Sequence, residues 1–171
     1  MRSLFLLILF IFGGGDTNSD LVRTRELYYK ASANTSQTET LSSFLSASPK
    51  IDPYLLTGYQ GLCFMLRARE VWNPYSKLSY FNKGKDMLNM AINKSPDQVE
   101  LRFLRFCVQT NAPAFLGYKN EIPADKSLIL KKYSSLNDED LKIRIKNYLG
   151  ASTYCSDSEK KLFSLRVPKG V

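Results

Sequence analysis

Apolar residues recur every three or four positions along most of this chain, which is the spacing of amphipathic helices. The first clear example begins at Asp52 and Pro53, where Asp suits the N-cap and Pro suits the first helical position. Its apolar residues at helical spacing are Leu55, Tyr59, Leu62 and Leu66. The pattern predicts that this helix ends near Val71, ahead of Asn73 and Pro74.

Similar patterns predict helices over residues 76–93, 96–111, 125–133 and 137–150, and a short one over 156–165. A weaker pattern through Leu41, Phe44 and Leu45 predicts a short helix beside a polar loop within residues 32–48. Alternating runs typical of strands are almost absent, and there is no Asn-Gly hairpin signal. The sequence therefore predicts an all-α fold, either an antiparallel helical bundle or a short tetratricopeptide-like array of about six to seven helices.

Glycines mark the first two strong helices as close neighbours of another backbone. Gly58 and Gly61 lie one turn apart, and Gly84 lies in line with the apolar face of the following helix. Since glycine costs a helix roughly 1 kcal/mol relative to Ala, we expect a second helix to approach there closely.

Aromatic and aliphatic residues around and beyond Pro74 are expected to be buried. Trp72 and Tyr75 flank this proline and are predicted to pack into the core. The apolar face predicted for the helix at 76–93 comprises Leu78, Phe81, Leu88, Ala91 and Ile92.

The N-terminus has the pattern of an export signal. Arg2 precedes an apolar run from Leu4 to Phe12, and three glycines follow at 13–15. Nine apolar residues are too few to span a bilayer, which needs about 20. We therefore expect a signal peptide at 1–15, export to the periplasm or beyond, and no transmembrane span after cleavage. The remaining chain divides into a polar segment with short helices at 16–51, a helical core at 52–165 and a frayed tail at 166–171.

Composition narrows the chemistry. The formal charge is +8, with the basic residues spread along the chain, and there is no histidine. Without histidine, a Gly-rich phosphate loop, a GxSxG elbow or an HExxH motif, we expect a protein that is not an enzyme and holds no metal or cofactor. Cys63, Cys107 and Cys155 show no zinc spacing. Cys63 and Cys107 lie within apolar helical patterns, so these two are expected to be buried thiols, with a Cys63–Cys107 bridge as the alternative.

The helix predicted from Pro96 is apolar over an arc of about 220°, which places it centrally in the core. Ser95 and Gln98 are expected to form its capping box. The remaining arc holds a polar stripe of Gln98, Arg102, Arg105 and Gln109. Two interpretations are open. The first is structural: the stripe is simply the solvent-facing edge of the helix, or its arginines pair with acids such as Glu70 or Asp125. The second is functional: the stripe is part of an anion or peptide groove. That groove would comprise Arg102, Arg105, Gln109, Asn111, Tyr118 and Lys119.

Spacing at Gly84, Leu88, Ala91 and Pro96 resembles one degenerate tetratricopeptide-like unit. The chain as a whole resembles a group of uncharacterised exported proteins of Bacteroidetes-type bacteria. The likeness rests on residues 59–61, 83–92 and 99–118, with Asp125 and Lys126 beyond them. This resemblance implies a helical, repeat-like fold over residues 20–150 and implies no activity.

Taken together, these patterns favour an exported, non-enzymatic helical module that binds a protein or peptide. The alternative is an envelope protein that binds an anionic glycan or lipid through its basic surface. The export signal disfavours nucleic acid as a partner.

Overall fold

The computed structural model describes residues 17–47 and 49–164, and within these ranges the chain is all-helical, with no strand. This confirms the predicted fold class. The expected signal peptide and the expected tail at 166–171 lie outside the described residues. The helices are α1 (Thr17–Ala33), α2 (Thr38–Ser46), α3 (Pro53–Glu70), α4 (Pro74–Lys94), α5 (Val99–Asn111), α6 (Ile122–Tyr133), α7 (Glu139–Ala151) and α8 (Asp157–Ser164), with 3₁₀ turns at Thr35–Gln37 and Ala114–Leu116.

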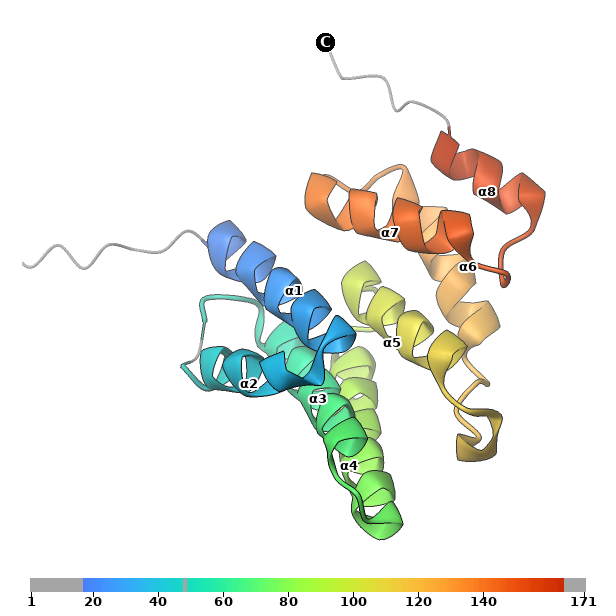
Figure 1. Ribbon diagram of the computed structural model, residues 1–171. Helices are drawn as coiled ribbons and strands as arrows, with labels where there is room; N and C mark the ends of the chain where they lie inside the picture. Colours follow the sequence, from blue (N-terminus) through green and yellow to red (C-terminus); the bar gives the residue numbers. More distant parts are fainter. Residues whose placement is uncertain (1–16, 48, 165–171) are drawn as a thin grey trace, which may run out of the picture.

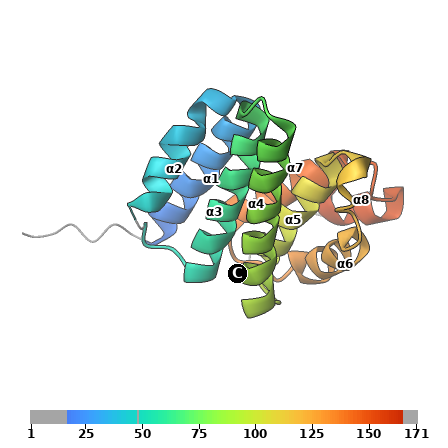
Figure 2. The same ribbon diagram turned by 90° about the horizontal axis from the view of Figure 1, so that it is seen from below.

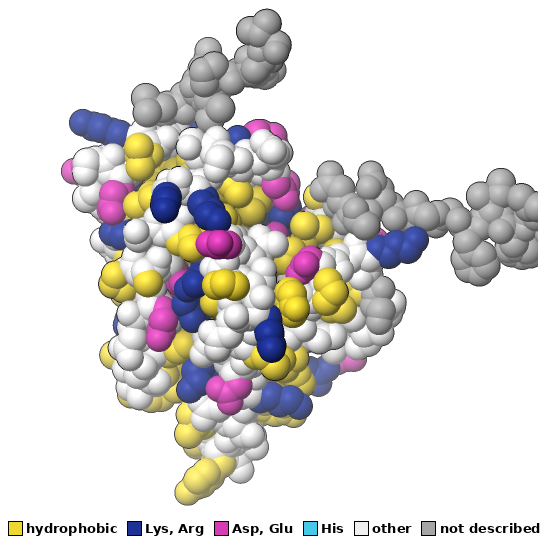
Figure 3. Space-filling model, turned by 180° about the vertical axis from the view of Figure 1, so that it is seen from behind, with side chains coloured by type: hydrophobic (Ala, Val, Ile, Leu, Met, Phe, Trp, Pro, Cys, Tyr) yellow, Lys and Arg dark blue, Asp and Glu magenta, His cyan; other side chains and the backbone are white. Residues whose placement is uncertain are grey.

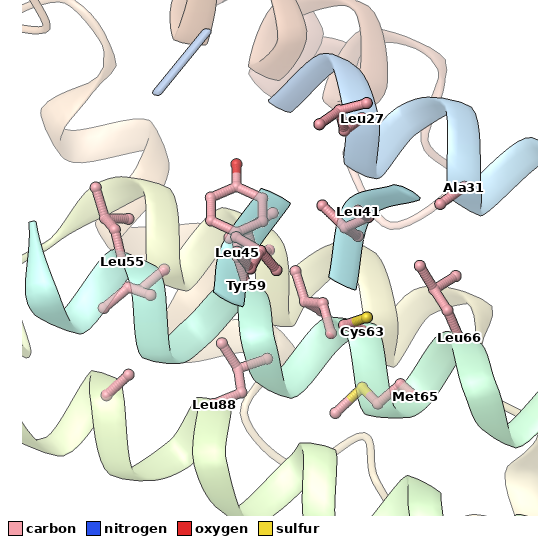
Figure 4. Close-up of a cluster of buried hydrophobic side chains, with 14 of the residues drawn as sticks. Leu27, Ala31, Leu41, Leu45, Leu55, Tyr59, Cys63, Met65, Leu66 and Leu88 are labelled. Carbon is pink, nitrogen blue, oxygen red and sulfur yellow. The ribbon is translucent and has the colours of Figure 1, made fainter. Parts of the chain in front are cut away.

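The described part of the chain has more helix than the sequence patterns suggested. The segment expected to hold only short helices contains α1, which is 17 residues long, before the nine-residue α2. Buried residues of both helices, including Leu27, Ala31, Leu41 and Leu45, belong to a core cluster shared with α3 and α4 (Figure 4). The segment therefore packs as part of the helical core.

The helices form two groups that are consecutive in the chain and pack against each other (Figures 1 and 2). Helices α1–α4 form the N-terminal half, and α5–α8 form the C-terminal half. Helix α5 belongs to both hydrophobic clusters: Leu101 and Leu104 join the first, whereas Val99, Phe103 and Phe106 join the second. The central position predicted for this helix from its wide apolar arc is confirmed.

Local hydrogen bonds explain where the helices begin. The Asp52 side chain accepts from the backbone N–H groups of Tyr54 and Leu55, as expected for the N-cap of α3. The capping box predicted at Ser95 and Gln98 is wrong. The Gln98 backbone N–H donates to the Ser95 carbonyl at 3.1 Å in a turn, so α5 starts only at Val99.

Glycines let α3 and α4 approach closely, as predicted. A Cβ atom added to Gly61 would lie 2.7 Å from the Gly84 carbonyl oxygen. Real Cβ contacts are longer, so any side chain at this crossing would force the two helices apart. The crossing fixes α3 and α4 as a tightly packed hairpin.

The burial predicted around Pro74 is wrong. Trp72 is 96% exposed and Tyr75 is 87% exposed, and Leu78 is 48% exposed. Figure 1 shows the reason: the turn between α3 and α4 lies beyond the ends of the neighbouring helices, so no described element covers it. The rest of the expected face packs on the core: Leu88, Ala91 and Ile92 are buried, and Phe81 is half-buried against them.

Two further features bear on function. Cys63, Cys107 and Cys155 are all free, so the alternative of a Cys63–Cys107 bridge is wrong. Among the described helices, none combines the length and the apolar character needed to cross a membrane.

Candidate functional sites

The polar stripe on α5 faces α6 and makes ion pairs inside the protein. Arg105 donates from Nε to Asp125 Oδ2 at 2.7 Å and from Nη2 to Oδ1 at 2.8 Å. Arg102 Nη1 donates to the same Oδ1 at 3.0 Å. Asp125 is fully buried, and burial alone would lower the pKa of Arg105, but the bonds to Asp125 outweigh it and raise that pKa. The interpretation in which these arginines pair with Asp125 is the one realised.

The other predicted site residues do not converge on one opening. Gln109 is fully buried and donates from Nε2 to Glu121 at 2.6 Å, while its Oε1 has no partner among the described residues. Tyr118 is buried and donates to Asn89 at 3.2 Å. Asn111 and Lys119 point elsewhere, to the Cys107 carbonyl and the Tyr154 hydroxyl. Ligand binding by these residues stays a prediction.

A second ion cluster joins the two halves of the molecule, and the sequence patterns did not reveal it. Arg25 of α1 is 1% exposed and forms a double hydrogen bond with Glu100 of α5, at 2.7 and 2.6 Å. The same guanidinium reaches Asp138 at 2.6 Å and Asp140 at 2.9 Å, at the start of α7. Tyr59 of α3 donates to Glu100 at 2.7 Å, so four helices meet at this cluster.

Electrostatics favour the ionised forms of Arg25, Asp138 and Asp140 in this cluster. Burial would lower the pKa of Arg25, but the hydrogen bonds that Arg25 donates to Glu100 and Asp138 raise it well above its ordinary value. Burial also opposes ionisation of Asp138 and Asp140, yet bonds from Arg25, and from Arg144 to Asp140, lower both carboxyl pKa values. Each of the three carboxylates accepts a hydrogen bond from Arg25, so this arginine ties α1 to α5 and α7.

The described surface is hollowed between α2 and α4, over the outer side of α3. This groove encloses about 370 Å³. Its apolar lining comes from Leu45, Cys63, Phe64 and Met87, and its polar lining from Ser42, Ser46, Gln60 and Arg67. Cys63 sits at the buried end, where burial raises the pKa of its thiol and keeps it protonated.

Arg67 is held at the wall of this groove by contacts from α2. Its Nη2 donates to Glu39 at 2.8 Å and to Ser42 at 3.1 Å. On α4, Lys83 lies 4.1 Å from the centre of the Phe64 ring, which fixes that aromatic beside the groove. The groove is thus a preformed slot with four apolar and four polar lining residues, and its one charged lining residue, Arg67, is already paired.

The second exposed feature is the aromatic tip, which we define as Trp72, Tyr75 and Leu78. These residues occupy the α3–α4 turn and the first turns of α4. That turn lies at the bottom of the molecule in Figure 1. Elsewhere on the face in Figure 3, Lys and Arg are interspersed with Asp and Glu, without a single broad basic area.

No family model matches the chain, and neither a curated protein nor a solved structure matches it.

Proposed function

We propose that this protein is an exported, non-enzymatic helical module that binds a protein or peptide partner in the groove between α2 and α4. The observation that carries the proposal is the groove itself, a slot of about 370 Å³ on the outside of the α3–α4 hairpin, with apolar side chains in half of its lining. That volume lies within the range of sites that enclose small ligands and anchoring side chains, roughly 300–1,000 Å³. Stacked helix pairs commonly bind extended or helical peptides on such surfaces.

The lining defines what kind of anchor fits. Leu45, Phe64 and Met87 favour an aliphatic or aromatic side chain, and methionine adapts to different shapes. Ser46 and Gln60 at the rim supply hydrogen-bonding groups for a peptide backbone. Because Arg67 is already paired with Glu39, binding is expected to rest on apolar contact and to depend weakly on salt.

Capture from native envelope extract, with the protein as bait, tests this proposal. Ser46→Trp places an indole into the groove, while Ser43→Trp on the same helix is the matched control, because Ser43 is exposed and does not line the groove. We expect a partner that is retained by the parent and by Ser43→Trp, lost from Ser46→Trp, and little affected by added salt. Equal capture by all three proteins, or no specific partner, would count against the proposal.

A further inference from the structure

The aromatic tip is the largest concentration of exposed apolar side chains in the described surface that the groove does not use. Trp72 is 96% exposed, Tyr75 is 87% exposed and Leu78 is 48% exposed, all within seven residues of sequence. Isolated exposed apolar residues are ordinary, but a cluster of large ones marks a surface that contacts something else.

The tip is both rigid and convex. The Asn73 side chain accepts from the backbone N–H of Tyr75 at 2.8 Å, which caps α4 directly beneath the tip. The close crossing at Gly61 and Gly84 holds the rest of the hairpin. A protein partner would need a matching concave pocket for such a protrusion, whereas the interface of a lipid bilayer accepts a convex apolar wedge of any shape. Tryptophan and tyrosine are the side chains that concentrate at that interface.

The charged residues around the tip favour a partner surface that is anionic. Residues 69–80, which span the tip, contain one acidic residue, Glu70, and two basic residues, Arg69 and Lys77. Lys77 stands beside Tyr75 and Leu78, is exposed, and has no ion-pair partner among the described residues. Basic residues held close to a bilayer are attracted by anionic headgroups.

We propose that the aromatic tip is an anchor that inserts Trp72, Tyr75 and Leu78 into the headgroup region of an anionic lipid bilayer. The contact is peripheral and reversible, since three side chains enter the interface and the flanking lysine and arginine side chains stay at the headgroups. This inference is independent of the groove, which lies between α2 and α4 and can stay open while the tip is inserted.

The chain itself supplies the reporter for the test, because Trp72 is its single tryptophan. The protein without its expected signal peptide, residues 16–171, is titrated with vesicles of equal parts phosphatidylcholine and phosphatidylglycerol, and separately with phosphatidylcholine alone. We expect the Trp72 emission to shift to shorter wavelength, and its quenching by acrylamide to fall, with the anionic vesicles only. Salt should reverse both changes.

Two lysine variants separate the tip from general surface charge. Lys77→Glu should weaken vesicle binding by about fivefold or more, on the scale expected for each charge near an anionic surface. Lys146→Glu on α7 makes the same change in net charge at another exposed position and should bind like the parent. Tyr75→Ser should reduce the emission shift, with circular dichroism confirming the fold.

Three results would overturn the inference. The first is an unchanged Trp72 emission with anionic vesicles. The second is binding that does not depend on charge at the tip. It would be seen as equal binding to neutral and anionic vesicles, or as equal weakening of vesicle binding by the two lysine variants. The third is a shift produced by a captured protein partner and not by lipid, which would assign the tip to protein recognition.

Discussion

Replacing Arg25 with methionine should destabilise the protein severely, because Arg25 is the positive centre of a buried junction between the two halves. The side chains of Arg25 and Glu100 are 1% and 3% exposed. In Arg25→Met, Glu100 loses its two bonds at 2.7 and 2.6 Å and keeps only the Tyr59 hydroxyl. A buried carboxylate left in this way carries most of its desolvation cost without compensation.

The size of the loss can be worked out from these contacts. Two charge-assisted hydrogen bonds at about 1.5–3 kcal/mol each suggest about 3–6 kcal/mol. Breaking a buried ion pair from one side typically costs about 3–5 kcal/mol, in agreement. Losing the contacts to Asp138 and Asp140 adds little to this loss of stability, because their side chains are 31% exposed and water can hydrate them once Arg25 is gone. We therefore expect a loss of about 3–5 kcal/mol.

Urea unfolding followed by circular dichroism measures this loss. At a slope of about 2 kcal/mol/M, the midpoint should fall by about 1.5–2.5 M. Arg23→Met is the matched control on the same helix, since Arg23 and Glu26 form an exposed pair at 3.5 Å, and it should cost less than about 1 kcal/mol. Removing both buried partners, in Arg25→Met with Glu100→Met, should restore much of the stability. A single variant as stable as the control would refute the reasoning.

Three other predictions follow from packing and electrostatics. Gly84→Ala should lower the free energy of unfolding by about 1–3 kcal/mol, because the new methyl group meets the backbone of α3. Gly150 has open space around it, so Gly150→Ala should raise the free energy of unfolding by about 0.4–1 kcal/mol in the same urea assay. Equal effects of the two substitutions would contradict the close crossing. The lowered pKa values of Asp138 and Asp140 mean that the unfolded chain binds their protons more tightly, so their contribution is complete above the unfolded carboxyl pKa of about 3.9 and is lost as pH falls through the lower folded values. Unfolding free energies measured between about pH 6 and about pH 2 should show this decline, and a flat profile would contradict it. Burial raises the pKa of the Cys63 thiol, so a disulfide reagent at neutral pH should modify it slowly in the native state and rapidly in urea; fast native reaction would show that the thiol is accessible.

The sequence predicted those features that depend on the pattern of residues within a single helix. The wide apolar arc of α5 predicted a central helix, and Leu101 and Phe103 do face different clusters. The paired glycines at 58 and 61 predicted that another helix backbone comes close, because glycine otherwise costs helix stability, and at Gly61 the close backbone is that of α4. Asp125 was named as one possible partner of the α5 arginines, and it is the residue that binds them.

Features that depend on distant segments could not be read from local patterns. The Arg25 junction joins residues 75 and 113 positions apart, and nothing in the polar sequence of α1 marks that arginine as buried. The exposure of Trp72 was missed for a related reason: its hydrophobicity suggests burial, but the length of the α3–α4 hairpin carries it beyond the neighbouring helices. The groove depends on how α2, α3 and α4 pack together, which periodicity alone does not determine.

Site-specific photocrosslinking in the native host tests the proposed function most directly. A photoreactive amino acid at Gln60 would sit in the groove, and one at Asn147, exposed on α7, serves as the control position. We predict a discrete crosslinked product with one protein partner from position 60, absent from position 147 and abolished by Ser46→Trp. No product from position 60, or the same products from both positions, would contradict a partner bound in this groove.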